Sequence, residues 1–153
     1  MAVYNDRSAL PGLSGDALTT LRGRVRGPVL TSTDPDYDTA RRVWNASIDR
    51  HPGAIIRAAD TRDLRIAVTH ARTHRLPFAI RGGGHDVAGN GTCDGGLVLD
   101  LGGLKGIRVD PNARTVRVQP GVVWSELDAA LAQYSLALTG GQISSTGVTG
   151  LTL

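Results

Sequence analysis

The chain has 153 residues, the length of one ordinary domain with room for a sizeable core. Hydrophobic residues make up 41% and charged residues 20% of it, and no apolar run approaches the ~18 residues of a membrane-spanning helix. The composition therefore excludes a membrane-spanning helix. The first residues contain no apolar signal core, so we expect a cytoplasmic protein. The single cysteine, Cys93, cannot form an internal disulfide or a thiolate metal site alone.

The charged residues are distributed in a way that argues against a nucleic-acid partner. The 17 Lys and Arg residues outnumber the 14 Asp and Glu residues, giving a formal net charge of +3. The arginines of the N-terminal half alternate with aspartates, and only Arg22-Gly23-Arg24-Val25-Arg26 forms a basic cluster. Few aromatic residues stand near that cluster to stack on bases. The pattern predicts a solvated surface.

The N-terminal third predicts an extension and a helix. Residues 1–33 carry scattered Gly and Pro, with one short helix predicted over 15–23, and we interpret them as an N-terminal extension. The dipeptide Asp34-Pro35 predicts the start of a second helix, as N-cap and first helical residue. Its apolar residues recur at helical spacing as far as Ile48, before a Pro-Gly pair ends the pattern.

The next segment predicts a strand, a helix and a second strand. Residues 54–58 have the length and apolarity of a buried strand, Asp60 is placed to cap the following helix, and residues 78–81 begin another strand. The buried stripe predicted for the helix consists of Leu64, Ala67, Val68 and Ala71. Two strands joined by a helix form a βαβ unit, so we expect the strands to be parallel.

The remaining elements complete an α+β domain. Residues 97–101 predict a third strand, 107–118 a hairpin with alternating polarity, and 123–134 an amphipathic helix. The tail from 139 to 153 is rich in Gly, Ser and Thr. We therefore expect a βαβ unit followed by a mixed sheet with a hairpin and flanking helices.

The loop Arg81–Gly89 is the most informative stretch for function. It follows a predicted parallel strand, which is the usual place for a ligand in such a sheet. Its glycines Gly82, Gly83 and Gly84 permit positive φ angles and close approach of backbone N–H groups, and consecutive N–H groups suit a pyrophosphate. The spacing matches neither a dinucleotide fingerprint nor a P-loop. From the residues alone, the loop is either an anion-binding turn or a structural turn.

The histidines and Cys93 offer weaker signals. His85 ends the glycine run, where an imidazole serves as nucleophile, base, metal ligand or simple hydrogen-bonding group, and the adjacent Asp86 is a candidate to orient it. His70 and His74 stand one helical turn apart, a spacing suited to zinc, but without further ligands, so we expect no metal site. Cys93 lies between glycine turns, and we expect a buried, inert thiol.

Four motifs occur in a characteristic order: RGGGH at 81–85, DGGLVLDL at 94–101, GVVW at 121–124, and the Gly-rich tail 140–153. Together they resemble the flavin-binding half of the vanillyl-alcohol-oxidase superfamily, with its PCMH-type FAD-binding domain. The likeness is strongest to the berberine-bridge-enzyme-like and 6-hydroxy-D-nicotine-oxidase-like FAD-linked oxidases. We assign residues 34–153 to the N-terminal portion of such a domain and expect the chain to be a fragment without the remainder and the substrate domain.

The resemblance implies FAD as the cofactor. The glycine loop would wrap the pyrophosphate, and residues 140–150 would run beside the flavin. His85 stands where the family's covalent histidine joins the 8α-methyl group of the isoalloxazine. Many relatives add a cysteine link, but Ile143 occupies that position here, so we expect one link, through His85. The residues expected to contact FAD are Arg81, Gly82, Gly83, Gly84, His85, Asp86, Gly89, Gly141, Thr146, Gly147 and Gly150.

The resemblance also implies an activity for a longer protein. Such an enzyme accepts hydride from a C–H bond of an alcohol, an amine or a sugar and passes the electrons to oxygen. The catalytic tyrosine of many relatives has no counterpart here, so we expect no catalytic residue in the chain and no activity from it alone. We also expect no membrane partner. The alternative is a folded, ligand-free, non-catalytic fragment.

Overall fold

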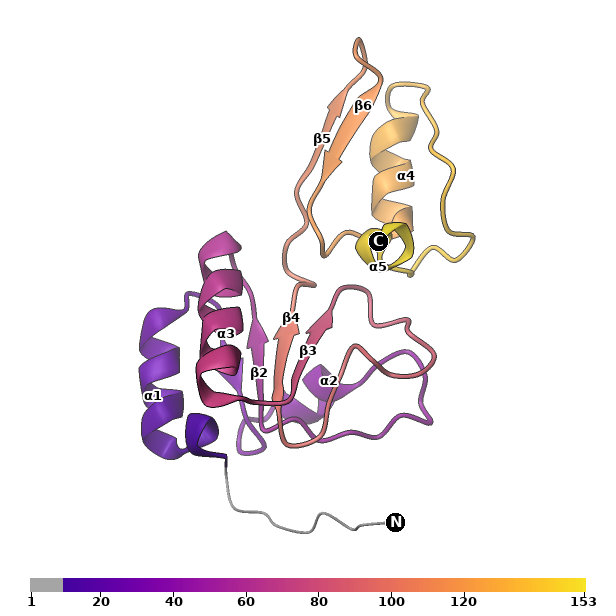
Figure 1. The fold of residues 1–153 in the computed structure, drawn as a ribbon. Coiled ribbons are helices and arrows are strands. Elements are labelled where there is room, and N and C mark those ends of the chain that lie inside the picture. Colours follow the sequence, from indigo (N-terminus) through magenta and orange to yellow (C-terminus); the bar gives the residue numbers. More distant parts are fainter. Residues whose placement is uncertain (1–9) are drawn as a thin grey trace.

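Four strands form one sheet in the order β1-β2-β4-β3 in the computed structural model, which describes residues 10–153 (Figure 1). β2 (Ala54–Arg57) and β3 (Phe78–Arg81) both pair in parallel with β4 (Leu97–Asp100), which lies between them. β1 (Val29–Leu30) pairs antiparallel with β2 at the edge. The parallel strands predicted for the βαβ unit are therefore confirmed, with a third strand inserted between them.

Helices cover both faces of this sheet. The 3-10 helix η1 (Pro11–Leu13), α1 (Gly15–Arg24) and α3 (Thr61–His74) pack on one face, and the short α2 (Tyr37–Arg41) packs on the other. Successive strand residues point to opposite faces, so alternate residues of β2 and β4 enter the two core clusters. Burial on both faces explains why these strands are continuous apolar runs.

A second unit lies beyond the carboxyl ends of the strands, at the top of Figure 1. The hairpin of β5 (Ile107–Asp110) and β6 (Thr115–Val118) packs one face against α4 (Trp124–Ala132), with α5 (Val148–Thr152) beside them. The unit has its own apolar cluster, which contains Val122, Trp124, Leu127, Leu131 and Val148. The predicted hairpin is confirmed, and the predicted helix is confirmed as far as Ala132.

The prediction of one long helix across residues 34–48 is wrong. α2 ends at Arg41, because Arg42 is extended with φ −65° and ψ 144°. Asp34 does not cap it: the carboxylate accepts hydrogen bonds from the backbone and hydroxyl of Thr31 at 2.7 and 2.8 Å. Instead, the Trp44 backbone N–H bonds to the glycine loop, so tertiary contacts override the helical periodicity of the segment.

α3 confirms its predicted cap and corrects one residue of its predicted stripe. The Asp60 carboxylate accepts from the backbone N–H groups of Arg62 and Asp63 at the helix start. Val68 is 38% exposed, whereas His70 is buried. His70 Nε2 lies 2.7 Å from the carbonyl oxygen of Gly12, so η1 offers a polar partner that the apolar pattern of α3 does not reveal.

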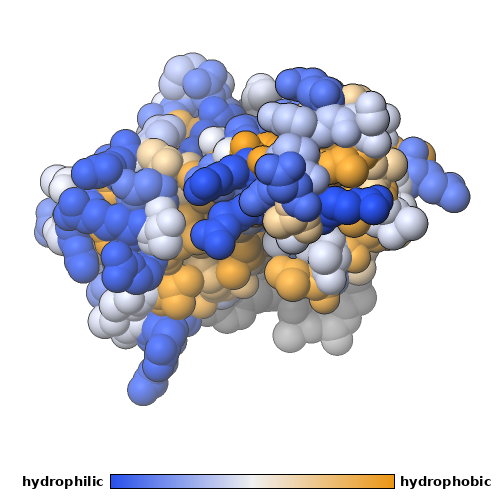
Figure 2. All heavy atoms as spheres, turned by 90° about the horizontal axis from the view of Figure 1, so that it is seen from above, coloured by the Kyte–Doolittle hydropathy of each residue, from blue (hydrophilic) through white to orange (hydrophobic). Residues whose placement is uncertain are grey.

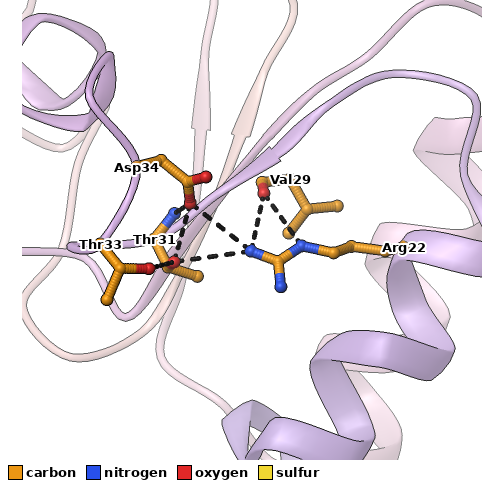
Figure 3. Close-up of polar contacts among 5 residues, drawn as sticks. All are labelled: Arg22, Val29, Thr31, Thr33 and Asp34. Carbon is orange, nitrogen blue, oxygen red and sulfur yellow. Dashed lines mark hydrogen bonds and ion pairs between the residues drawn. The ribbon is translucent and has the colours of Figure 1, made fainter.

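The N-terminal segment is tied to the sheet through Arg22 of α1 (Figure 3). Its guanidinium donates to the carbonyl oxygen of Val29 at 3.2 Å and to the Asp34 carboxylate at 3.5 Å. The first bond covers an outward carbonyl of the short edge strand β1, which blunts that edge. Leu21 and Val25 enter the same core cluster as the strands, while the division of the chain at residue 33 stays a prediction.

The surface around the second unit is mixed. Seen from above, hydrophobic residues reach the surface in several places between hydrophilic ones (Figure 2). Exposed apolar side chains include Ile143 and Leu151, which are 59% and 53% exposed. Within residues 10–153, no helix has the length and apolarity needed to cross a membrane.

Candidate functional site

A cavity of about 340 Å³ opens where β3 ends. Its walls come from the end of β3, the glycine loop and the segment 146–151, which belongs to the second unit. It lies outside the carboxyl end of a parallel strand, where ligands bind in open α/β sheets. The lining contains every residue expected at the cofactor site except Gly89 and Gly141.

Two glycines bring the two units into backbone contact at the floor of this cavity. A Cβ added to Gly83 would overlap the backbone nitrogen of Gly147 and lie 2.7 Å from its Cα. A Cβ added to Gly147 would lie 2.5 Å from the nitrogen of Gly83. Gly147 is fixed in turn by a β-bridge to Val123. Only glycine fits at either position of this crossing.

Several carbonyl groups in and just after the glycine loop accept hydrogen bonds from a neighbouring segment. The partners come from residues 44–50: Trp44 N bonds to Gly84 O at 3.0 Å, Asn45 Nδ2 to Val87 O at 2.8 Å, and Arg50 Nη1 to Gly89 O and Thr92 O at 2.7 and 2.9 Å. Within the described chain, the N–H groups of residues 82–85 donate no hydrogen bond to another residue. Gly84 has a φ of +71°, which glycine adopts without strain. This arrangement suits an anion.

Removing the Arg50 guanidinium is expected to loosen the loop. In Arg50→Ala the carbonyls of Gly89 and Thr92 lose a charged donor, so the loop geometry relaxes and affinity for an anionic ligand falls about tenfold. Arg72→Ala removes the same charge from an exposed helix position and serves as the control. Ligand titration at two salt concentrations measures both, and equal losses in the two variants would contradict a specific role for Arg50.

His85 is held from two sides at the cavity rim. Its Nε2 lies 3.0 Å from the Ser145 hydroxyl, and its ring stacks on the Trp44 indole with centroids 5.2 Å apart and planes 20° apart. Asp86 does not touch this ring: its carboxylate accepts from the backbone N–H of Asn90 at 2.9 Å, a bond that lowers the pKa of Asp86. Trp44 and Ser145 therefore orient His85, and Asp86 closes the turn behind it.

Arg81 lines the cavity, but its charge is committed elsewhere. The guanidinium is buried and donates to the Asp100 carboxylate at 2.8 Å and to the carbonyl oxygens of Ala40 and Arg42 at 2.6 and 3.2 Å. It thereby joins α2 to the adjacent strand β4. An anion in this site would therefore face backbone dipoles and not a free guanidinium of Arg81.

Gly89 and Gly141 have other contacts. Gly89 has a φ of +78°, and a Cβ there would lie 2.7 Å from Ile48. A Cβ on Gly141 would lie 2.7 Å from Trp124 Nε1, so this glycine lets the tail cross the indole closely. The lining residues missing from the sequence prediction are Ile80, Asn90, Gly91 and Leu151. Of these, only Gly91 carried a signal, because residues 82–96 contain seven glycines.

The remaining candidates from the sequence are the His70–His74 pair and Cys93. The His70 and His74 rings contact each other at a tilt, with centroids 4.5 Å apart and planes 48° apart. No cluster of at least three His, Cys, Asp or Glu side chains suited to a metal occurs among residues 10–153. Cys93 is half-buried, and burial raises the pKa of its thiol, which lowers the thiolate fraction available for reaction.

Sequence comparison decides which family this site belongs to. The sequence model of the FAD binding domain family matches residues 52–153, which include the whole cavity. The chain belongs to the FAD binding domain family. The FAD-linked oxidoreductase YgaK of Bacillus subtilis strain 168 is 37% identical to this FAD-binding domain over 130 residues, which are 85% of this chain and 29% of the relative.

Solved structures show the same fold. 6-Hydroxy-D-nicotine oxidase from Arthrobacter nicotinovorans matches with a TM-score of 0.80 at 29% identity, over 82% of this chain and 28% of that one. The BBE-like 1 protein of Physcomitrella patens matches with a TM-score of 0.79 at 25% identity, over 87% of this chain and 29% of that one. The expected PCMH-type fold is therefore confirmed, and this FAD-binding domain spans less than a third of each relative.

Proposed function

We propose that this chain holds the FAD of a flavin-dependent oxidoreductase, with the pyrophosphate in the glycine cradle and a single covalent link through His85. The observation that carries the proposal is the crossing of Gly83 and Gly147, where side-chain-free backbone borders a cavity and the N–H groups of residues 82–85 have no acceptor within the described chain. Such an arrangement suits a pyrophosphate held by backbone dipoles.

Different residues of the site hold different parts of FAD. Backbone N–H groups of Gly82, Gly83 and Gly84 donate to the phosphates, and Thr146 and Gly147 close the opposite wall. His85 attaches the flavin ring at the rim. Ile143 offers no thiol where many relatives have a cysteine, which supports one link rather than two.

When bound, FAD accepts a hydride from a C–H bond of an alcohol, an amine or a sugar and passes the electrons to oxygen. This chain's own contribution is to bind the cofactor and to fix its orientation. The substrate-binding groups and the acid or base that acts on substrate are assigned to the rest of a longer protein, since the chain spans less than a third of its relatives. The cytoplasmic location stays a prediction.

Fluorescence titration of the purified chain with FAD and with FMN tests the cofactor assignment. FMN lacks the pyrophosphate bridge and the adenosine, so a pyrophosphate cradle predicts that FAD binds at least about tenfold more tightly, a difference of about 1.4 kcal/mol. Equal affinities would contradict the role of the glycine loop. No saturable binding of either flavin would support the ligand-free alternative.

A further inference from the structure

The two ring nitrogens of His85 have different surroundings. Nε2 faces the Ser145 hydroxyl at 3.0 Å, and the ring plane is fixed by stacking on Trp44. Nδ1 has no hydrogen-bond partner among residues 10–153. Within the described residues, Nε2 therefore has a hydrogen-bond partner and Nδ1 has none, in an imidazole that is partly buried.

The backbone around Ser145 is anchored, so its hydroxyl has a defined position. The carbonyl oxygens of Ser144 and Thr146, on either side of it, accept hydrogen bonds from the backbone N–H groups of Ser125 and Trp124, both at 3.0 Å. These donors are in the first turn of α4, whose N–H groups have no partner within the helix. The helix start thus holds the segment that carries Ser145 against the glycine loop.

We propose that Ser145 is a positioning residue that selects Nδ1 of His85 as the nitrogen bonded to the flavin. This inference rests on the proposed function. A neutral imidazole has one N–H donor and one acceptor nitrogen. When Nε2–H donates to the Ser145 oxygen, the lone pair is on Nδ1. Stacking on Trp44 fixes the plane of the ring, which lines the cavity.

Attachment replaces one hydrogen of the 8α-methyl group by the imidazole. The Nδ1–C8α bond forms, and one C–H bond of the 8α-methyl group breaks. The methyl proton leaves to water, and the electron pair of the C–H bond passes to the isoalloxazine. Molecular oxygen then takes up this pair with two protons and leaves as hydrogen peroxide. The ring is an imidazolium once Nδ1 has bonded, and it becomes neutral when Nε2 releases its proton to water, so two protons are lost in all. The proton on Nε2 is held by Ser145 while Nδ1 bonds.

The test compares wild type, Ser145→Ala, Ser145→Thr and Ser32→Ala. Ser32 is exposed and makes no side-chain hydrogen bond within the described chain, so it is the matched control. The chain is mixed with FAD, and intact mass is followed with time. We expect attachment to slow about tenfold in Ser145→Ala, the effect of one lost hydrogen bond, to recover in Ser145→Thr, and to be unchanged in Ser32→Ala.

Nitrogen NMR of 15N-histidine-labelled protein provides a readout that would stay unchanged if Ser145 had only a structural role. Before FAD is added, the His85 ring should carry its proton on Nε2 in wild type and lose that preference in Ser145→Ala. After attachment, correlations from the 8α protons should reach Nδ1. Attachment at Nε2, or an unchanged proton position and rate in Ser145→Ala, would overturn the inference. Failure of wild type to attach FAD would count against the proposed function, while the proton position would still test Ser145.

Discussion

Gly83→Ala is expected to disrupt the cradle and weaken FAD binding by at least about tenfold. The new methyl group would overlap the backbone nitrogen of Gly147, and backbone on both sides leaves no flexible side chain to yield. Overpacking of this kind costs about 1–3 kcal/mol. The two units must move apart at the floor of the cavity, which separates Thr146 and Gly147 from the loop. FAD titration measures the loss in affinity, and thermal unfolding measures the accompanying loss in stability.

Gly23→Ala is the matched control for that substitution. Gly23 lies in α1, and nothing lies within 4 Å of a Cβ added there. The same methyl group should leave FAD affinity unchanged and stabilise the helix by up to about 1 kcal/mol. Unchanged affinity in Gly83→Ala, or equal losses in both variants, would contradict the backbone crossing.

Asp63→Ala is expected to destabilise the fold by about 3 kcal/mol or more. The Asp63 side chain is fully buried at the start of α3 and accepts hydrogen bonds from the backbone N–H groups of Arg26, Gly27 and Ala59 at 2.8, 2.9 and 3.0 Å. Each buried donor left without an acceptor costs about 1–3 kcal/mol. Urea unfolding measures the change, and Asp128→Ala, an exposed position on α4, is the control. A loss below about 1 kcal/mol would contradict this account.

The same carboxylate predicts a dependence of stability on pH. Burial of Asp63 opposes its ionisation, but the N–H groups of Ala59, Arg26 and Gly27 outweigh it and lower the pKa below the ordinary 3.8. A pKa that is lower in the folded state stabilises the fold above the unfolded value, and this stabilisation is lost as pH falls through the folded value. The free energy of unfolding should therefore fall on acidification below about pH 5, and less steeply in Asp63→Asn than in wild type.

Local signals in the sequence account for the elements that were predicted correctly. Asp60 marks the start of α3 because the cap and its partners lie within three residues, and the hairpin follows from alternation and its turn. The glycine run before His85 marked the cavity, because backbone without side chains is a local property. The four motifs together identified the FAD-binding family, which the comparisons then confirmed.

The rest depends on contacts between distant segments. Trp44 belongs to the apolar pattern of a helix, yet its indole stacks on His85 and its backbone bonds to Gly84. The sequence leaves Arg81 free to bind a ligand, but in the structure its guanidinium donates to the Asp100 carboxylate. Ser145 is sixty positions from His85, and only the crossing of the two units brings them together. None of these pairs leaves a periodic or spacing signal in the sequence.

The most direct test of the account is an intact mass spectrum of the acid-denatured chain after incubation with FAD, beside His85→Ala. We expect an increase corresponding to one FAD in wild type and no increase in His85→Ala, because Ile143 has no thiol and Cys93 is half-buried. An adduct that persists in His85→Ala would contradict the assigned link and point to Cys93. No adduct in wild type would contradict the claim that this chain attaches its own flavin.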